Sequence, residues 1–121
     1  MSESKGVEFV QALADKDEEA LARILDPAVD FRAMTPGKFW EANTVPEIVK
    51  IVFGSWMTET EHVEAVEAVE TETLVDRYRV GYRLRMRTDE GRFLVAQQAF
   101  FDTAGDRITW LRIMCAGFLP A

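Results

Sequence analysis

The stretch that decides the fold is RYRVGYRLRMR, residues 77–87, in which arginines alternate with apolar side chains. A period of two over this length is typical of a β-strand with one buried face and one solvated face. The apolar side is formed by Tyr78, Val80, Tyr82, Leu84 and Met86. We therefore predict an exposed row of arginines that faces Glu64, Glu67 and Glu70 on a neighbouring strand.

Two further strands follow from turn signals in the C-terminal half. Residues 88–91 and 103–106 each combine polar side chains with a glycine, which is typical of hairpin turns. We therefore predict strands over 92–102 and 107–116 that continue an antiparallel meander.

Residues 62–73 are ambiguous, because the valines at 63, 66 and 69 recur every third residue. That spacing fits neither a flat strand nor an ideal α-helix. We predict a strand with a bulge, since an extra residue returns out-of-phase side chains to one face. A helix within 58–72 is the alternative, because Thr58 and the residues after it offer a helix cap.

The N-terminal half shows helical spacing instead of alternation. Apolar residues over 6–14 predict a first helix, and a capping box at Asp15 and Glu18 predicts a second helix that stops before Pro27. Residues 44–57 predict a third helix, which begins with a threonine cap and a proline in its first turn.

A short hairpin separates the second and third predicted helices. Residues 29–33 alternate like a half-buried strand, and 39–42 return as the second arm after a turn that contains a proline. Helices first and an antiparallel meander afterwards predict a single α+β domain over 1–121, in which one face of the sheet wraps the helices.

Length and charge limit the function. The 121 residues, 48% of them hydrophobic, suffice for one domain with a sizeable core. The 14 basic and 21 acidic residues give a net charge of −7, which disfavours nucleic acids and anionic membranes as partners. Because no apolar run approaches a membrane span and the first residues do not resemble a leader, we expect a cytoplasmic protein.

Cysteine and histidine usage leaves little room for common active-site chemistry. The single cysteine, Cys115, excludes an internal disulfide, and the single histidine, His62, gives no basis for a zinc site. We therefore expect neither a metal nor a cofactor. We expect His62 to face solvent rather than act as a base, and Cys115 to be a small core residue rather than a nucleophile.

Large aromatic side chains are the stronger functional signal. A curved sheet closed by helices tends to leave an apolar cavity at its open end. The aromatic set is compatible with such a ligand pocket and equally with a plain packed core. It comprises Phe9, Phe31, Trp40, Phe53, Trp56, Tyr82, Phe93, Phe101 and Trp110.

Three segments carry a family resemblance: LDPAVDF at 25–31, FD at 101–102 and GDRI at 105–108. With the order of elements, they resemble the nuclear transport factor 2-like (NTF2-like) superfamily and its SnoaL-like branch. The resemblance implies a cone-shaped fold, with three N-terminal helices on the concave face of a curved, mainly antiparallel sheet. It further implies a deep pocket between sheet and helices and a homodimer formed through the sheet, but no single reaction.

The catalytic positions of the characterised branches are changed in this chain. Ketosteroid isomerases of this fold use a tyrosine, a basic aspartate and a protonated aspartate, whose positions align with Phe9, Phe31 and Gln97. Gln97 retains the ability to donate a hydrogen bond to a carbonyl. Epoxide hydrolases of this fold need inward Asp and Arg groups, and this chain has Ile113 at one of the acid positions and Gly81 near the other. The resemblance therefore supports neither reaction.

An inward Gln97 determines which side of each strand faces the pocket. Trp110 and Arg112 then lie on the outer face, where an exposed tryptophan indicates a dimer contact. Asp30 and Glu41 are candidates for the pocket mouth. The predicted lining consists of Phe9, Phe31, Trp40, Trp56, Tyr82, Leu84, Met86, Val95, Gln97, Leu111, Ile113 and Cys115.

We therefore predict a dimeric SnoaL-like domain that takes a small, largely apolar molecule, oriented by Gln97 and a tyrosine hydroxyl. Whether it is an enzyme stays open. If it is one, of isomerase or cyclase type with non-standard residues, Tyr78 or Tyr82 is the candidate acid and Asp30 the candidate base. The alternative is a noncatalytic dimerisation or accessory binding module with a solid core.

Overall fold

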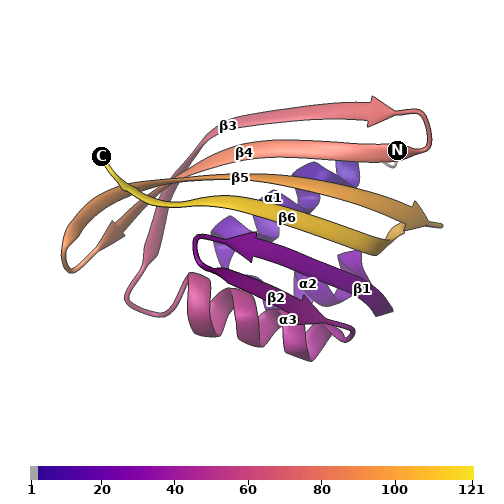
Figure 1. Ribbon diagram of the computed structural model, residues 1–121, viewed down its shortest axis with the longest axis horizontal. Helices are drawn as coiled ribbons and strands as arrows, with labels where there is room; N and C mark the ends of the chain where they lie inside the picture. The colour runs from indigo at the N-terminus through magenta and orange to yellow at the C-terminus, as the bar shows by residue number, and fades with distance from the viewer. Residues whose placement is uncertain (1–2) are drawn as a thin grey trace.

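The computed structural model describes residues 3–121, which form one curved sheet with helices on one side (Figure 1). The strand order is β2-β1-β6-β5-β4-β3. Neighbouring strands are antiparallel, except for the parallel pair β1 and β6. The strands are β1 (Leu25–Thr35), β2 (Lys38–Ala42), β3 (His62–Leu74), β4 (Arg77–Thr88), β5 (Gly91–Ala104) and β6 (Arg107–Pro120).

Three α-helices pack against one face of this sheet: α1 (Ser4–Asp15), α2 (Glu18–Ile24) and α3 (Val45–Ile51) (Figure 1). Helix α1 buries Phe9 and Leu13 against the sheet. The inward side chains of β4 are buried as its alternation predicts, from Val80 to Met86. The predicted α+β fold is therefore confirmed.

The helix ends follow local chemistry, with one correction. Helix α2 is capped by Asp17, whose carboxylate accepts a hydrogen bond from the Ala20 backbone N–H at 3.0 Å. The capping box predicted at Asp15 is wrong, because α1 runs through Asp15 and ends at Lys16 in the left-handed region (φ 53°). The predicted cap of α3 is confirmed: Thr44 accepts from the Glu47 backbone N–H at 3.3 Å.

The third helix changes its winding before it ends. Its α-helical part stops at Ile51 and continues as a π-helical turn, η1 (Val52–Trp56). The Met57 backbone N–H donates to the Val52 carbonyl at 2.8 Å, five residues earlier. This wider turn rotates the last side chains relative to an α-helix, so Trp56 is carried inward to bury its ring.

Strand β3 confirms the predicted strand with a bulge and excludes a helix there. Its pairing with β4 shifts register twice, between Val63 and Ala65 and between Val66 and Ala68. The predicted cross-strand ion pairs are present, with Arg85 Nη2 2.7 Å from a Glu67 oxygen. Arg79, Arg85 and Arg87 of this row are thus paired with glutamates.

Candidate functional site

An inner hollow of about 460 Å³ lies where η1, the β1–β2 turn, the start of β5 and the end of β6 diverge. Its size is in the range of small-molecule pockets, and Gln97 borders it. The wall is mainly apolar and aromatic. It consists of Thr35, Pro36, Trp40, Ser55, Trp56, Met57, Glu61, Val95, Gln97, Cys115, Gly117 and Phe118.

A buried hydrogen bond fixes the orientation of the Gln97 side chain. Gln97 is 4% exposed, and its Oε1 accepts a hydrogen bond from the Tyr82 hydroxyl at 2.5 Å. Since Oε1 is held by Tyr82, the amide nitrogen Nε2 is left to donate elsewhere. Gln97 lines the hollow, so the amide can present this donor to a molecule that enters it. Among the described residues, the fully buried side-chain donor without a partner is Trp56 Nε1 rather than Gln97 Nε2.

Tyr82 remains a neutral hydroxyl in this position. Burial, with a smaller contribution from the nearby Cys115 thiol, raises the pKa of Tyr82 far above its usual value. A hydroxyl with a raised pKa is a weak acid that keeps its proton at neutral pH, so it remains available to donate to Gln97. Tyr82 consequently contributes to the hollow by holding the side-chain amide of Gln97 in one orientation.

Trp56 contributes a second donor to the wall. Its indole Nε1 is buried without a hydrogen-bond partner among the described residues. The ring packs against Phe31 at 6.3 Å and edge-on against Trp40 at 6.1 Å between centroids. An unpaired buried N–H costs about 1–3 kcal/mol, so an acceptor that enters the hollow would recover this free energy.

Trp40 differs from Trp56 in that its donor is already used. The Trp40 indole Nε1 donates to the Thr35 hydroxyl at 2.8 Å, which braces the β1–β2 turn. The Lys38 ammonium lies 4.0 Å from the Trp40 ring centroid. Of these two indoles of the described chain, Trp56 has the donor that is left for a ligand, because the donor of Trp40 is used by Thr35.

Glu61 is an ionised group on this wall that sequence analysis missed. Partial burial raises the pKa of its carboxyl, but hydrogen bonds from Thr58 and Thr60 and the charge of Lys16 together lower it below the usual value. In the sequence, Glu61 belongs to the run 58–61, which signals only a helix cap. Its place beside the hollow depends on the turn between η1 and β3.

Five of the residues predicted to line the pocket border the hollow: Trp40, Trp56, Val95, Gln97 and Cys115. The others pack into the core, where large side chains fill the space between sheet and helices. These are Phe9, Phe31, Tyr82, Leu84, Met86, Leu111 and Ile113. Beyond Glu61, the additional wall residues come in equal number from the β1–β2 turn, from the end of the third helix and from β6, which extends past the predicted end at 116 to Pro120. They are Thr35, Pro36, Ser55, Met57, Gly117 and Phe118.

The candidate acid and base are not brought together. The Asp30 carboxylate accepts a hydrogen bond from Arg112 Nη1 at 3.2 Å. The Tyr78 ring packs on Phe101, with 5.4 Å between centroids, and Tyr82 is bonded to Gln97. None of Asp30, Tyr78 and Tyr82 borders the hollow.

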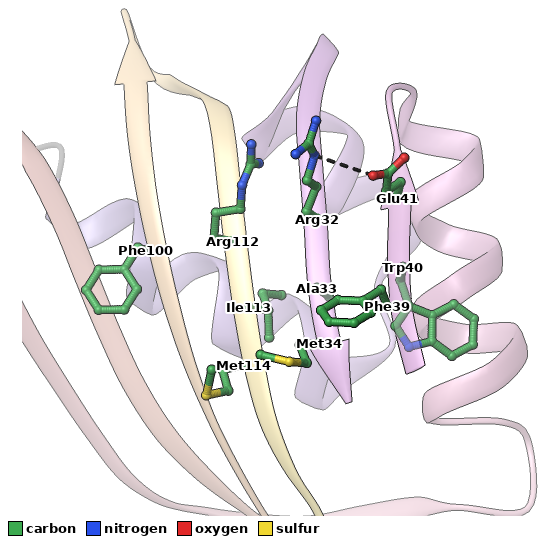
Figure 2. Close-up of a pocket in the computed structure, with 10 residues that line it drawn as sticks. All are labelled: Arg32, Ala33, Met34, Phe39, Trp40, Glu41, Phe100, Arg112, Ile113 and Met114. Atoms are coloured by element: carbon green, nitrogen blue, oxygen red, sulfur yellow. Dashed lines mark ion pairs between the residues drawn. The ribbon is translucent and has the colours of Figure 1, made fainter. Parts of the chain in front are cut away.

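A second hollow, of about 420 Å³, lies on the outer face of the sheet, away from the helices (Figure 2). Apolar side chains occupy its centre, and Phe39 and Met114 are 77% and 56% exposed. Arg32 and Glu41 form an ion pair at 3.7 Å on its border, so Glu41 does not lie at the mouth of the inner hollow. Arg112 also lines the outer hollow.

Trp110, predicted to be exposed for a dimer contact, is partly covered. The guanidinium carbons of Arg77 and Arg112 lie 3.7 and 4.4 Å from its ring centroid, and the residue is half-buried. These stacked cations cover part of the ring. The large exposed apolar surface of the outer face is therefore formed by Phe39 and Met114 rather than by Trp110.

Within residues 3–121, no group of three or more metal-type ligands is close enough to hold an ion. His62 is exposed at the start of β3, as predicted. Cys115 is a free, half-buried thiol on the wall of the inner hollow. None of the helices within these residues has the length and apolar character needed to cross a membrane.

Solved structures share this architecture. A candidate isomerase from Bacillus subtilis has a TM-score of 0.74 at 15% identity, over 95% of this chain and 89% of that one. An LEH-like epoxide hydrolase from M. tuberculosis has a TM-score of 0.67 at 12% identity, over 94% of this chain and 81% of that one. A candidate SnoaL-like polyketide cyclase from Jannaschia sp. CCS1 has a TM-score of 0.63 at 17% identity, over 94% of this chain and 87% of that one.

The chain therefore has the fold of NTF2-like and SnoaL-like proteins, as the sequence resemblance implies. At these identities the similarity shows the fold alone. The sequence matches no protein-family model and no curated protein. The function has to be argued from the site itself.

Proposed function

We propose that this chain binds a small, largely apolar molecule in the inner hollow and orients it through hydrogen-bond donors on the wall. One observation carries the proposal. Trp56, whose buried Nε1 has no partner among residues 3–121, lines an apolar hollow together with the almost completely buried amide of Gln97. A carbonyl or similar acceptor on the ligand would satisfy a donor that otherwise destabilises the fold.

The wall favours binding over acid–base catalysis. Glu61 is the only carboxylate among the described residues that line the hollow, and its lowered pKa makes it a weak base. The raised pKa of Tyr82 makes that hydroxyl a weak acid. Enzymes that use carboxylic acids at neutral pH raise the pKa of those groups instead. We therefore propose ligand capture as the primary role.

Mass spectrometry of compounds that copurify with the protein tests this proposal. We expect the native chain to retain an apolar compound and Gln97→Leu to lose most of it. Gln98→Leu is the matched control, because Gln98 is the exposed neighbour on the same strand. Equal retention by both variants would remove Gln97 from the site. An empty native protein that also binds no added apolar probe would refute the proposal.

We propose further that two copies associate through the outer face of the sheet. The outer hollow has an apolar centre, and its lining carries both signs of charge, from Arg32, Arg112 and Glu41. In a twofold contact, a patch of this kind can place arginine of one copy against glutamate of the other. This contact would support a dimeric binding protein, and without a ligand it would support the alternative of a dimerisation module.

Light scattering after size-exclusion chromatography measures this association. We expect a native dimer and a monomeric Met114→Glu variant, because the new carboxylate would be buried in the apolar centre. Val75→Glu is the control, since Val75 is fully exposed in the β3–β4 turn. A native monomer, or a dimer that Met114→Glu leaves intact, would contradict the proposed contact.

A further inference from the structure

Glu61 lies at the mouth of the inner hollow. It is half-buried, whereas Gln97 and Trp56 are almost completely buried. Glu61 also borders a neighbouring surface hollow together with Thr60 and Phe118, which places it between the interior and the surface. The wall therefore has donors in its buried part and an anionic acceptor near solvent.

The Glu61 carboxylate is held in place by hydroxyl hydrogen bonds to one of its two oxygens. Its Oε2 accepts hydrogen bonds from the hydroxyls of Thr58, at 2.5 Å, and Thr60. The Thr58 backbone also contributes a hydrogen bond to the carboxyl. Both hydroxyl hydrogen bonds converge on Oε2, which leaves Oε1 as the oxygen that they do not use. Lys16 Nζ fixes the turn by donating to the backbone carbonyls of Thr58 at 2.6 Å and Glu61 at 2.5 Å. A fixed acceptor of this kind loses little conformational entropy when a donor binds.

The charge around Glu61 favours a neutral donor over a cation. Lys16 is close enough to act electrostatically on the Glu61 carboxyl. Its positive charge offsets the attraction that the carboxylate would exert on an ammonium group. A hydroxyl group gains a charge-assisted hydrogen bond from the carboxylate without repulsion from Lys16.

From this arrangement, and resting on the function proposed above, we propose that the ligand is a neutral hydroxy-carbonyl compound. Its apolar body fills the hollow, its carbonyl accepts from Gln97 and Trp56, and its hydroxyl donates to Glu61 Oε1 at the mouth. Glu61 is then a specificity-determining residue, which selects molecules that carry a donor at the end opposite their acceptor.

Four probes that share one bicyclic skeleton separate these contacts by calorimetric titration. 6-Hydroxy-1-tetralone carries both groups, 1-tetralone only the carbonyl and tetralin neither, while 6-aminomethyl-1-tetralone replaces the hydroxyl by a cation. We expect 6-hydroxy-1-tetralone to bind about tenfold more tightly than 1-tetralone, the usual gain for one hydrogen bond to a charged group. The cationic probe should bind no more tightly than 1-tetralone.

Variants in the same turn assign the preference to Glu61. In Glu61→Gln, the tenfold preference should fall to about twofold, because the charge that strengthens the hydrogen bond is lost. Glu59→Gln, which removes the same charge from an exposed position two residues earlier, should keep the full preference. Protection of Cys115 from alkylation reports whether each probe occupies the inner hollow, since Cys115 lines it and is the only cysteine.

The outcomes distinguish this inference from the proposed function. Equal binding of 6-hydroxy-1-tetralone and 1-tetralone, or an unchanged preference in Glu61→Gln, refutes the role of Glu61 and leaves capture of an apolar molecule standing. Tighter binding of the cationic probe refutes a neutral ligand. If none of the four probes binds or protects Cys115, the proposed function fails as well.

Discussion

The hydrogen bond between Tyr82 and Gln97 provides the sharpest test of the site, because both partners are buried. Tyr82→Phe leaves Gln97 Oε1 without its donor, and Gln97→Leu leaves the Tyr82 hydroxyl without its acceptor. Each single change should lower the free energy of unfolding by about 1–3 kcal/mol, the cost of a buried unpaired polar group. The double variant removes both groups together, so its loss should be smaller than the sum of the single losses.

Urea unfolding followed by tryptophan fluorescence measures this cycle. With typical urea slopes, a loss of 1–3 kcal/mol shifts the midpoint by about 1 M, which is readily resolved. We expect a coupling free energy of about 1–3 kcal/mol between the two positions. Strictly additive losses would show that the two side chains do not interact. They would also refute the conclusion that Tyr82 fixes the orientation of the Gln97 amide.

Three further perturbations test separate parts of the structure. Gly6→Ala should lower the urea midpoint, because the added Cβ would lie 2.9 Å from Val80 Cβ; an unchanged midpoint would contradict this packing. Trp56→Phe should weaken 1-tetralone binding about tenfold and leave tetralin binding unchanged, and an equal effect on both probes would argue against the indole donor. Hydrogen bonds from the Asn43 backbone and the Thr44 hydroxyl lower the pKa of Glu47, so its stabilising contribution is present at neutral pH and is lost as pH falls through that lowered pKa. The urea midpoints of native protein and Glu47→Gln should therefore differ at pH 7 and converge as the pH falls through the lowered pKa, and a constant difference would refute the capping box.

The strands were predictable because their periodicity has a direct physical cause. In β4, one face packs on the helices and the other carries arginines paired with glutamates, so the alternation survives over the whole strand. The cap at Thr44 was predictable for the same reason, since it depends on residues three positions apart. The start of α2 was not, because Asp15 and Asp17 offer equivalent caps and Lys16 decides between them by taking a left-handed conformation.

The site was predictable only in part, because periodicity gives the direction of a side chain and not the space in front of it. Gln97 was placed inward correctly, and it borders the hollow. Phe9 and Phe31 also point inward, but neighbouring core side chains fill the space around them. Glu61 gave no signal, because its position depends on how the chain leaves the π-helical turn.

The location of the hollow follows from a mismatch between the two layers. The helical layer ends at Trp56, whereas β6 continues past it to Pro120. Gly117 allows this extension: it has φ +91°, and a Cβ there would lie 3.0 Å from Pro36 in the β1–β2 turn. A gap left by this mismatch alone would be most stable with walls that have no unpaired donors. The wall instead includes Trp56, whose buried Nε1–H is unpaired among the described residues. The cost of this unpaired donor is offset when an acceptor binds, and this favours a ligand site over a packing defect.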